Sequence, residues 1–161
     1  MKTLLLVRHA KSDWSHHGLD DHERPLNRRG KRDAPEMGRR LAERGVAPDV
    51  ILSSDAVRAR RTAELIAEAI GFGASRVITD ERLYAASADE VLRVVGELDG
   101  DLSVAIVVGH NPEMASLAHR FSEEIHEMPT CAVAEYEFEV DAWYELEDAL
   151  PVSVWVDTPR S

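Results

Sequence analysis

The sequence contains almost no cysteine and no long apolar run. Cys131 is the only cysteine among the 161 residues, so an intrachain disulfide is excluded and nothing indicates an oxidising compartment. The amino-terminal apolar run, residues 4–7, is too short for the core of a signal peptide, and no later run approaches the length of a membrane span. We therefore expect a soluble, cytoplasmic protein.

Basic residues are scarce in the second part of the chain. Lysine and arginine total 19 against 30 aspartate and glutamate residues, and the formal net charge of −11 argues against nonspecific binding to nucleic acid or to a membrane. Residues 1–61 hold 14 basic and 9 acidic groups, a net charge of +5, whereas residues 62–161 hold 5 and 21, a net charge of −16. An anionic ligand should therefore prefer the first part.

The chain also lacks a recognisable nucleotide-binding or metal-binding motif. Residues 71–76 contain two glycines, but they follow an expected helix and lack the third glycine of a dinucleotide-binding loop. His16, His17 and His22 lie among acids in a polar segment, residues 15–26, yet their spacing matches no common zinc or calcium pattern. We interpret this segment as a mobile lid, with metal binding as the alternative, and expect no metal and no cofactor.

Two short apolar segments end in side chains that suit phosphate chemistry. Residues 4–7 precede Arg8 and His9, and residues 104–108 lead to His110. We interpret both as buried strands, because each is too short for a helix and apolar on both faces. The carboxyl ends of such strands form the ligand crevice of an open α/β sheet. The alternative is that each strand simply ends in solvated polar residues.

A third expected strand, residues 50–52, leads into a helix with Arg58 in its first turn. A cation at that place opposes the helix dipole, and an anion bound in front of the helix would explain it. Two arginines and two histidines would then meet at one edge of the sheet. Such a cluster indicates a ligand site more strongly than a single polar strand end, which could simply be solvated.

The remaining pattern predicts helices between these strands and an antiparallel tail. Helices are expected at about residues 28–44, 56–70, 88–98 and 112–121, and further strands at residues 77–79 and within 132–156, one of them through Tyr144 and Leu146. The expected helix caps are Asn27, Ser53 to Asp55, Ser87, and Asn111 with Pro112 in the first helical position. We expect one α/β domain over residues 1–161, and a monomer.

Several of these segments resemble, in order, the signature segments of the histidine phosphatase (phosphoglycerate mutase-like) superfamily. They are residues 5–10 (LLVRHA), 53–59 (SSDAVRA) and 108–112 (VGHNP), with residues 24–27 (RPLN) and Gly30 similar to the segment ahead of the first long helix. The resemblance extends to about residue 122 and implies a three-layer αβα sandwich, with a mostly parallel central sheet and one or more antiparallel edge strands. Residues 8–11 (RHAK) and 83–87 (LYAAS) look most like the small SixA-type phosphohistidine phosphatases.

The resemblance implies a role for each matching residue. His9 would be the nucleophile that attacks phosphorus and forms a phosphohistidine enzyme intermediate. Arg8, Arg58 and His110 would form the phosphate pocket, and we expect Ser12 and Asn111 to contact the substrate as well. Two guanidinium groups supply the positive charge that phosphoryl transfer requires, so no metal is needed.

One position departs from the pattern of the superfamily. Many members carry a glutamate that protonates the leaving group, and in our alignment Ala85 occupies its place. Without an acid there, esters of alcohols should react slowly, whereas imidazole leaves readily from phosphohistidine. We therefore expect a phosphohistidine in a signalling protein as substrate. The alternatives are a phosphatase for small phosphorylated metabolites and a phosphate-binding module without turnover.

Overall fold

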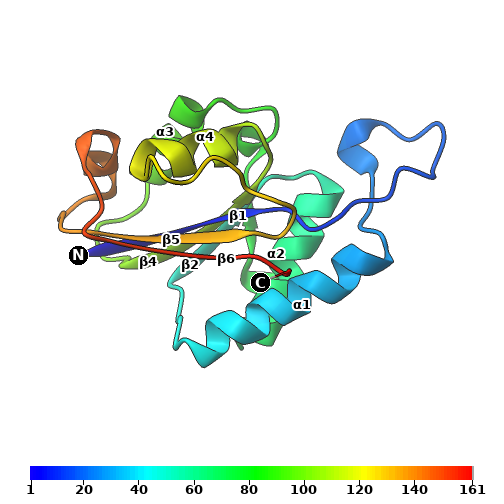
Figure 1. Cartoon of the computed structure of the whole chain (residues 1–161), viewed down its shortest axis with the longest axis horizontal. Coiled ribbons are helices and arrows are strands. Elements are labelled where there is room, and N and C mark those ends of the chain that lie inside the picture. Colours follow the sequence, from blue (N-terminus) through cyan, green and yellow to red (C-terminus); the bar gives the residue numbers. More distant parts are fainter. Residues whose placement is uncertain (161) are drawn as a thin grey trace.

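The computed structural model describes residues 1–160 and is built on a six-stranded sheet (Figure 1). The strands are β1 (Lys2–Arg8), β2 (Val50–Ser53), β3 (Ile78–Thr79), β4 (Val104–Gly109), β5 (Val133–Phe138) and β6 (Ser153–Asp157). Their order across the sheet is β3-β2-β4-β1-β5-β6. The first four in this order pair in parallel, whereas β5 pairs antiparallel with both β1 and β6. The predicted mostly parallel sheet with antiparallel strands toward one edge is confirmed.

Helices cover both faces of the sheet. Within residues 1–160 the α-helices are α1 (Arg28–Glu43), α2 (Val57–Ala69), α3 (Ala88–Gly96) and α4 (Glu113–Phe121), and the short 3-10 helices are η1 (Asp21–Glu23), η2 (Ala74–Arg76), η3 (Glu81–Leu83) and η4 (Trp143–Asp148). Helices α1 and α2 lie on one face, and α3 and α4 lie on the other (Figure 1). This is the three-layer αβα arrangement that the resemblance implied.

Strand β1 shows why its sequence is apolar at successive positions. Leu4 and Leu6 point into the core beneath α3 and α4, whereas Leu5 and Val7 point into the core beneath α1 and α2. All four side chains are fully buried. A strand that is covered on both faces cannot alternate with polar residues, so the short apolar run is the expected signature of a central strand.

Two of the predicted helix caps are confirmed. The Asn27 side chain accepts a hydrogen bond from the Gly30 backbone N–H at 2.9 Å and so starts α1. Ser87 accepts from the Glu90 N–H, and the Glu90 carboxylate accepts from the Ser87 N–H, which forms a capping box at the start of α3. In both cases the side chain satisfies a backbone donor that has no partner inside the helix.

The prediction that residues 53–55 cap the second helix is wrong. Ala56 is the cap residue of α2, and no side chain caps that helix end. The Ser54 hydroxyl oxygen accepts from the Ala56 N–H at 3.1 Å, one residue ahead of the helix. Ser54 therefore shapes the approach to α2, and its Oγ also lies 2.8 Å from His110 Nε2.

The start of α4 is also shifted from its predicted position. Pro112 is the cap and the helix begins at Glu113, so Asn111 lies outside it. The side-chain oxygen of Asn111 (Oδ1) accepts from the Ala115 N–H at 3.2 Å, and the side-chain nitrogen (Nδ2) donates to the Met128 carbonyl oxygen at 3.0 Å. Asn111 thus ties the loop after β4 both to α4 and to the segment before β5.

The strand expected through Tyr144 and Leu146 is absent, and the 3-10 helix η4 takes its place. Trp143 and Leu146 are both buried, and their spacing of three residues matches the period of a 3-10 helix better than that of a strand. The Glu145 carboxylate accepts from the backbone N–H groups of Asp141 and Ala142 and so fixes the first turn. These local hydrogen bonds favour the turn over an extended segment.

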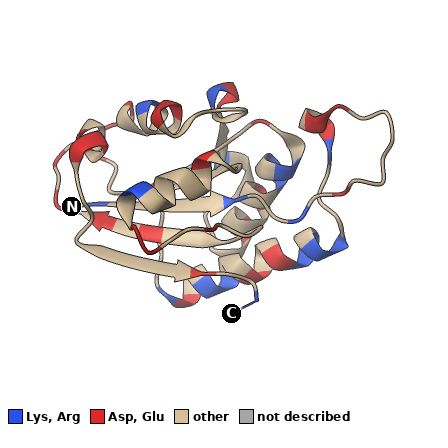
Figure 2. Cartoon of the chain, turned by 45° about the horizontal axis from the view of Figure 1, so that its top comes forward, with Lys and Arg blue, Asp and Glu red and all other residues tan. Residues whose placement is uncertain are grey.

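Charged residues lie mainly on the helices and loops (Figure 2). Along α1, basic and acidic residues are interspersed. Arg39 pairs with Glu36 and Glu43, and Arg40 pairs with Glu36 and Asp157. Much of the positive charge of the first part of the chain is therefore already paired within α1 and its neighbours. None of the helices in residues 1–160 is long and apolar enough to cross a membrane.

The start of α1 packs directly against the segment that follows β1. Gly30 is buried in the first turn, and a Cβ atom built on it would overlap the carbonyl oxygen of Lys11. That oxygen also accepts a hydrogen bond from the Asn27 N–H at 3.0 Å, so it cannot move away freely. The contact therefore holds the polar segment after His9 against α1.

We expect Gly30→Ala to destabilise the protein by about 1–3 kcal/mol, because the clash with Lys11 outweighs the roughly 1 kcal/mol that alanine gains over glycine inside a helix. The free energy of unfolding in urea measures the effect. Gly100→Ala is the control, since a Cβ there meets no atom within 4 Å. A Gly30→Ala protein as stable as the wild type would contradict this close packing.

Candidate active site

The carboxyl ends of the neighbouring strands β1 and β4 bring two histidines together. Arg8 ends β1 and His9 follows it, and His110 follows β4. The two imidazole rings are tilted by 55° with their centroids 5.2 Å apart. Arg58 joins them from the first turn of α2, and both histidines and Arg58 are buried. The structure thus gathers the four core residues that the sequence placed at one sheet edge.

His9 is held as a neutral imidazole with one nitrogen free. Its Nδ1 lies 2.7 Å from the carbonyl oxygen of Ala10, which can only accept, so Nδ1 carries the proton. Burial lowers the pKa of His9 to about 3, and the positive charges of Arg58 and Arg8 act in the same direction. The lone pair of Nε2 is therefore available at neutral pH, as a nucleophile requires.

The two arginines bring buried positive charge that the protein only partly pairs. Arg8 donates from Nη1 to the carbonyl oxygen of Met128 at 3.2 Å. Arg58 donates from Nη1 and Nη2 to the backbone and the carboxylate of Asp21, at 2.6 and 2.9 Å. The Nε atoms of both arginines are buried and have no partner among the described residues. Burial lowers the pKa of Arg8, as does the charge of Arg58. A bound anion would satisfy these groups.

His110 offers a further donor to the same space. Its Nε2 lies 2.8 Å from the Ser54 hydroxyl, whose oxygen already accepts from the Ala56 N–H, so the hydroxyl hydrogen can point to His110. In that tautomer His110 Nδ1 carries a proton, and this buried atom has no partner within residues 1–160. Burial lowers the pKa of His110 to about 4, so the ring is neutral at pH 7.

Asp21 of η1 places a carboxylate over this positive charge. It accepts from Arg58 Nη2 at 2.9 Å, from the Tyr84 hydroxyl at 2.7 Å and from Arg24 Nε at 3.2 Å. Burial alone would raise the pKa of Asp21, but the hydrogen bonds from Tyr84 and Arg58 outweigh it and hold the pKa well below its usual range. The expected lid, residues 15–26, is thus anchored to the site through this carboxylate.

A cavity of about 300 Å³ opens beside Arg58 and His110, and His9 and Arg8 are not among its lining residues. Its walls come from the lid, from α2, from the segment after η3 and from the start of α4, and its lining residues are Asp21, Arg58, Tyr84, Ala85, Ala86, His110, Asn111, Pro112 and Glu113. Such a volume lies at the small end of the range for ligand sites and holds a phosphoryl group with a modest leaving group.

Ser12 and Asn111 are placed differently from one another. Asn111 lines the cavity, although its amide group is already engaged by the backbone of Met128 and Ala115. Ser12 is buried outside the lining, where its hydroxyl accepts from Arg24 Nη1 at 2.5 Å and its backbone bridges to Leu26. Ser12 therefore supports the base of the lid, and a direct substrate contact would require the lid to rearrange.

Three lining residues escaped the sequence analysis as members of the site. Asp21 looked like one acid among several in a polar loop, and Tyr84 was noted only as part of a resembling segment. Glu113 was hidden as a first-turn acid of α4, a common complement to the helix dipole. The signal available in the sequence for Glu113 was its position directly after residues 110–112 (HNP).

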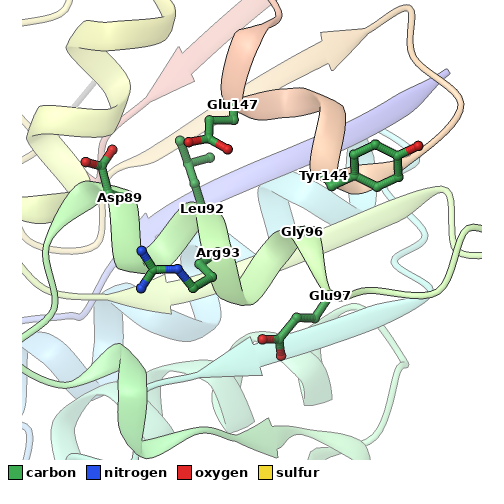
Figure 3. A pocket seen from close by; sticks show the side chains of 7 residues that line it. All are labelled: Asp89, Leu92, Arg93, Gly96, Glu97, Tyr144 and Glu147. Carbon is green, nitrogen blue, oxygen red and sulfur yellow. The ribbon is translucent and has the colours of Figure 1, made fainter.

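A second cavity, of about 290 Å³, lies between α3 and η4, away from these residues. Figure 3 shows Asp89 and Arg93 projecting from α3, Glu97 from the residue just after it, and Tyr144 and Glu147 from η4. It contains none of the predicted site residues and no side chain from a strand end. Among the described residues no group of three or more His, Cys, Asp or Glu side chains is arranged to hold a metal ion, in this cavity or elsewhere.

Comparison with known families agrees with this geometry. The family model described as "Histidine phosphatase superfamily (branch 1)" matches residues 4–91, more than half of the chain. The chain belongs to this superfamily, and phosphatase activity is the chemistry that membership supports.

Three known proteins show how far the similarity extends. A protein of Arabidopsis thaliana described as chloroplastic and uncharacterised is 30% identical over 152 residues, covering 89% of this chain and 70% of its own. Solved structures assigned as phosphohistidine phosphatase SixA, from Agrobacterium tumefaciens and Nakamurella multipartita, are 25% and 27% identical with TM-scores of 0.78 and 0.79. Each alignment covers 96% of this chain, and 97% and 95% of the respective structures. The chain is therefore of the SixA type.

The buried neutral histidines should make the fold sensitive to acid. The native state keeps His9 neutral down to about pH 3, whereas an unfolded histidine takes up a proton near pH 6.5, so stability falls as the pH drops below that value. Between pH 7 and pH 5 we expect His9 alone to account for a loss of about 2 kcal/mol in the free energy of unfolding.

Urea unfolding of wild type and His9→Asn at pH 7, 6 and 5 measures this contribution. The comparison between the two proteins is needed because the pKa of His22 is raised by its bonds to Asp55 and Glu23 and acts in the opposite direction. An equal loss of stability in both proteins would show that His9 is not held neutral.

Proposed function

We propose that this protein removes the phosphoryl group from a phosphohistidine in a signalling protein, through a covalent phosphohistidine formed on His9. The arrangement around His9 carries the proposal: a neutral imidazole with Nε2 free faces His110, in a site that also holds the half-buried Arg8 and the buried Arg58. This combination supplies a nucleophile, a neutral donor and positive charge in one desolvated place.

The geometry supports a two-step displacement. His9 Nε2 attacks phosphorus while its Nδ1–H stays bonded to Ala10, so the ring is oriented before the reaction begins. The unpartnered Nε groups of Arg8 and Arg58 and the Nδ1 of His110 are suited to the phosphoryl oxygens, whose charge spreads in the transition state. We propose that these groups act without a metal or cofactor, because the guanidinium groups supply the charge.

Asp21 must release Arg58 before a phosphoryl group can bind there. A phosphoryl dianion competes well for this place, because it has more charge and more acceptor oxygens than the Asp21 carboxylate. The lid can then remain attached through Arg24 and Ser12, which lie outside the cavity lining. We also propose the cytoplasm as the location of the protein and a monomer as its working state.

A small phosphorylated metabolite is the second candidate substrate, and the cavity of about 300 Å³ favours it, since that volume can enclose such a molecule. A phosphate-binding module without turnover is the third candidate, and the free Nε2 of His9 argues against it. A panel of a phosphohistidine protein, phosphoramidate, and aryl and alkyl phosphates, measured by phosphate release, separates the three.

We expect His9→Ala to abolish phosphate release and to leave the fold intact, because it removes the attacking nitrogen from a loop and not a core side chain. Acid quenching during turnover of a labelled substrate should trap phosphate on the wild type and not on His9→Ala. His126→Ala, at an exposed histidine, is the control and should behave as the wild type. Normal turnover by His9→Ala would refute the assignment of the nucleophile.

Arg58→Ala should weaken binding of vanadate by about 2 kcal/mol, roughly 30-fold, because it removes a charge-assisted donor pair from a buried site. Arg61→Ala is the matched control on the same helix, where the side chain is exposed and pairs only with Glu64. Inhibition constants against any substrate of the panel provide the measurement. Equal inhibition of Arg58→Ala and Arg61→Ala would remove Arg58 from the anion site.

A further inference from the structure

Glu113 is a buried acid in the wall of the candidate active site. It is the first residue of α4, only 3% exposed, and it lines the same cavity as Arg58 and His110. A glutamate in the first turn of a helix is usually exposed, where it complements the helix dipole at no cost of desolvation. Interaction with the helix dipole therefore does not explain why Glu113 is buried at the cavity.

No cation compensates this carboxyl group. Within residues 1–160 Glu113 forms no ion pair, and its Oε2 atom is buried without a hydrogen-bond partner. Burial raises the pKa of Glu113, and the charge of Glu90 adds to the rise, while the backbone N–H groups of Glu113 and Ala86 oppose it. An unpaired buried carboxylate is costly, so burial favours the neutral, protonated form of this group, which can donate its proton.

The position of this acid suits the departing group. Its backbone partner Ala86 follows Ala85, and both residues line the cavity beside it. His9 and His110 meet at the strand ends, and Glu113 and Ala86 line the cavity together with His110 and Arg58. A phosphoryl group between the histidines and Arg58 can therefore direct its leaving group toward Glu113.

We propose that Glu113 is the general acid of this site and protonates the leaving atom of the substrate. The proposal rests on the phosphatase function proposed above and names a residue that this function did not use. It also replaces the expectation, drawn from Ala85 alone, that the leaving group departs without an acid.

The proposed reaction has two halves, and Glu113 donates a proton in the first and takes one back in the second. His9 Nε2 forms a bond to phosphorus as the bond from phosphorus to the leaving oxygen or nitrogen breaks, and the Glu113 proton moves to that leaving atom. The product alcohol or imidazole departs, and Glu113 remains as a carboxylate. A water molecule then attacks phosphorus, the N–P bond returns its electron pair to His9, and Glu113 takes a proton from the water.

The test compares leaving groups in wild type and Glu113→Gln. The amide keeps the size of the side chain but has no acidic proton. We expect the kcat/KM of Glu113→Gln to fall by about 10²–10⁴ for alkyl phosphates, and by less than about 10-fold for p-nitrophenyl phosphate, whose leaving group needs no proton. Glu123→Gln, at an exposed acid just beyond α4, is the control and should match the wild type on every substrate.

A uniform loss across all leaving groups, or no loss at all, would overturn the role of Glu113. Should Glu113→Gln not fold, the wild type alone still decides: an alkyl rate within about 10³-fold of the p-nitrophenyl rate supports an acid, and a wider gap excludes one. Absence of any turnover by the wild type would end the proposed function itself. Turnover that traps phosphate on His9, with an unchanged ratio of leaving groups, would end only the assignment of Glu113.

Discussion

Burial of positive charge at the end of β1 and in the first turn of α2 is the constraint on which the site depends. Burial lowers the pKa of Arg8, and the charge of Arg58 lowers it further. Arg8 is bonded to one backbone carbonyl, and Arg58 is bonded to Asp21. Burial lowers the pKa of His9 and of His110, and the two arginine charges lower both further, so the rings stay neutral. The same charges that would attract a phosphoryl group therefore also favour the neutral form of His9, the proposed nucleophile.

The parts of this site that could be predicted from sequence are those that a strand carries to its own end. The apolar run before Arg8 and His9, and the similar run before His110, place these residues by local pattern alone. The helix caps Asn27 and Ser87 are local in the same sense, because each side chain bonds a backbone group three residues away.

The parts that could not be predicted depend on contacts between distant segments. Asp21 meets Arg58 and Tyr84 across 37 and 63 residues of chain, and no periodicity encodes such a meeting. Glu113 becomes an unpaired acid only when α4 packs beside the segment of Ala86, since the same residue on an open helix end would be an ordinary carboxylate. Likewise η4 forms because Trp143 is drawn into the core, which outweighs the strand propensity of the segment.

The two carboxyl groups of the cavity are pushed toward opposite protonation states. Asp21 accepts from Arg58 and Tyr84, which favours its ionised form, whereas Glu113 forms no ion pair among the described residues and burial favours its protonated form. Such a division separates an anion that can be exchanged from an acid that can react. A phosphoryl group that takes Arg58 from Asp21 leaves that carboxylate with its bonds from Tyr84 and Arg24, and brings its own negative charge near Glu113. Since a negative charge raises the pKa of a nearby acid, binding strengthens the hold of Glu113 on its proton until the leaving atom develops charge of its own.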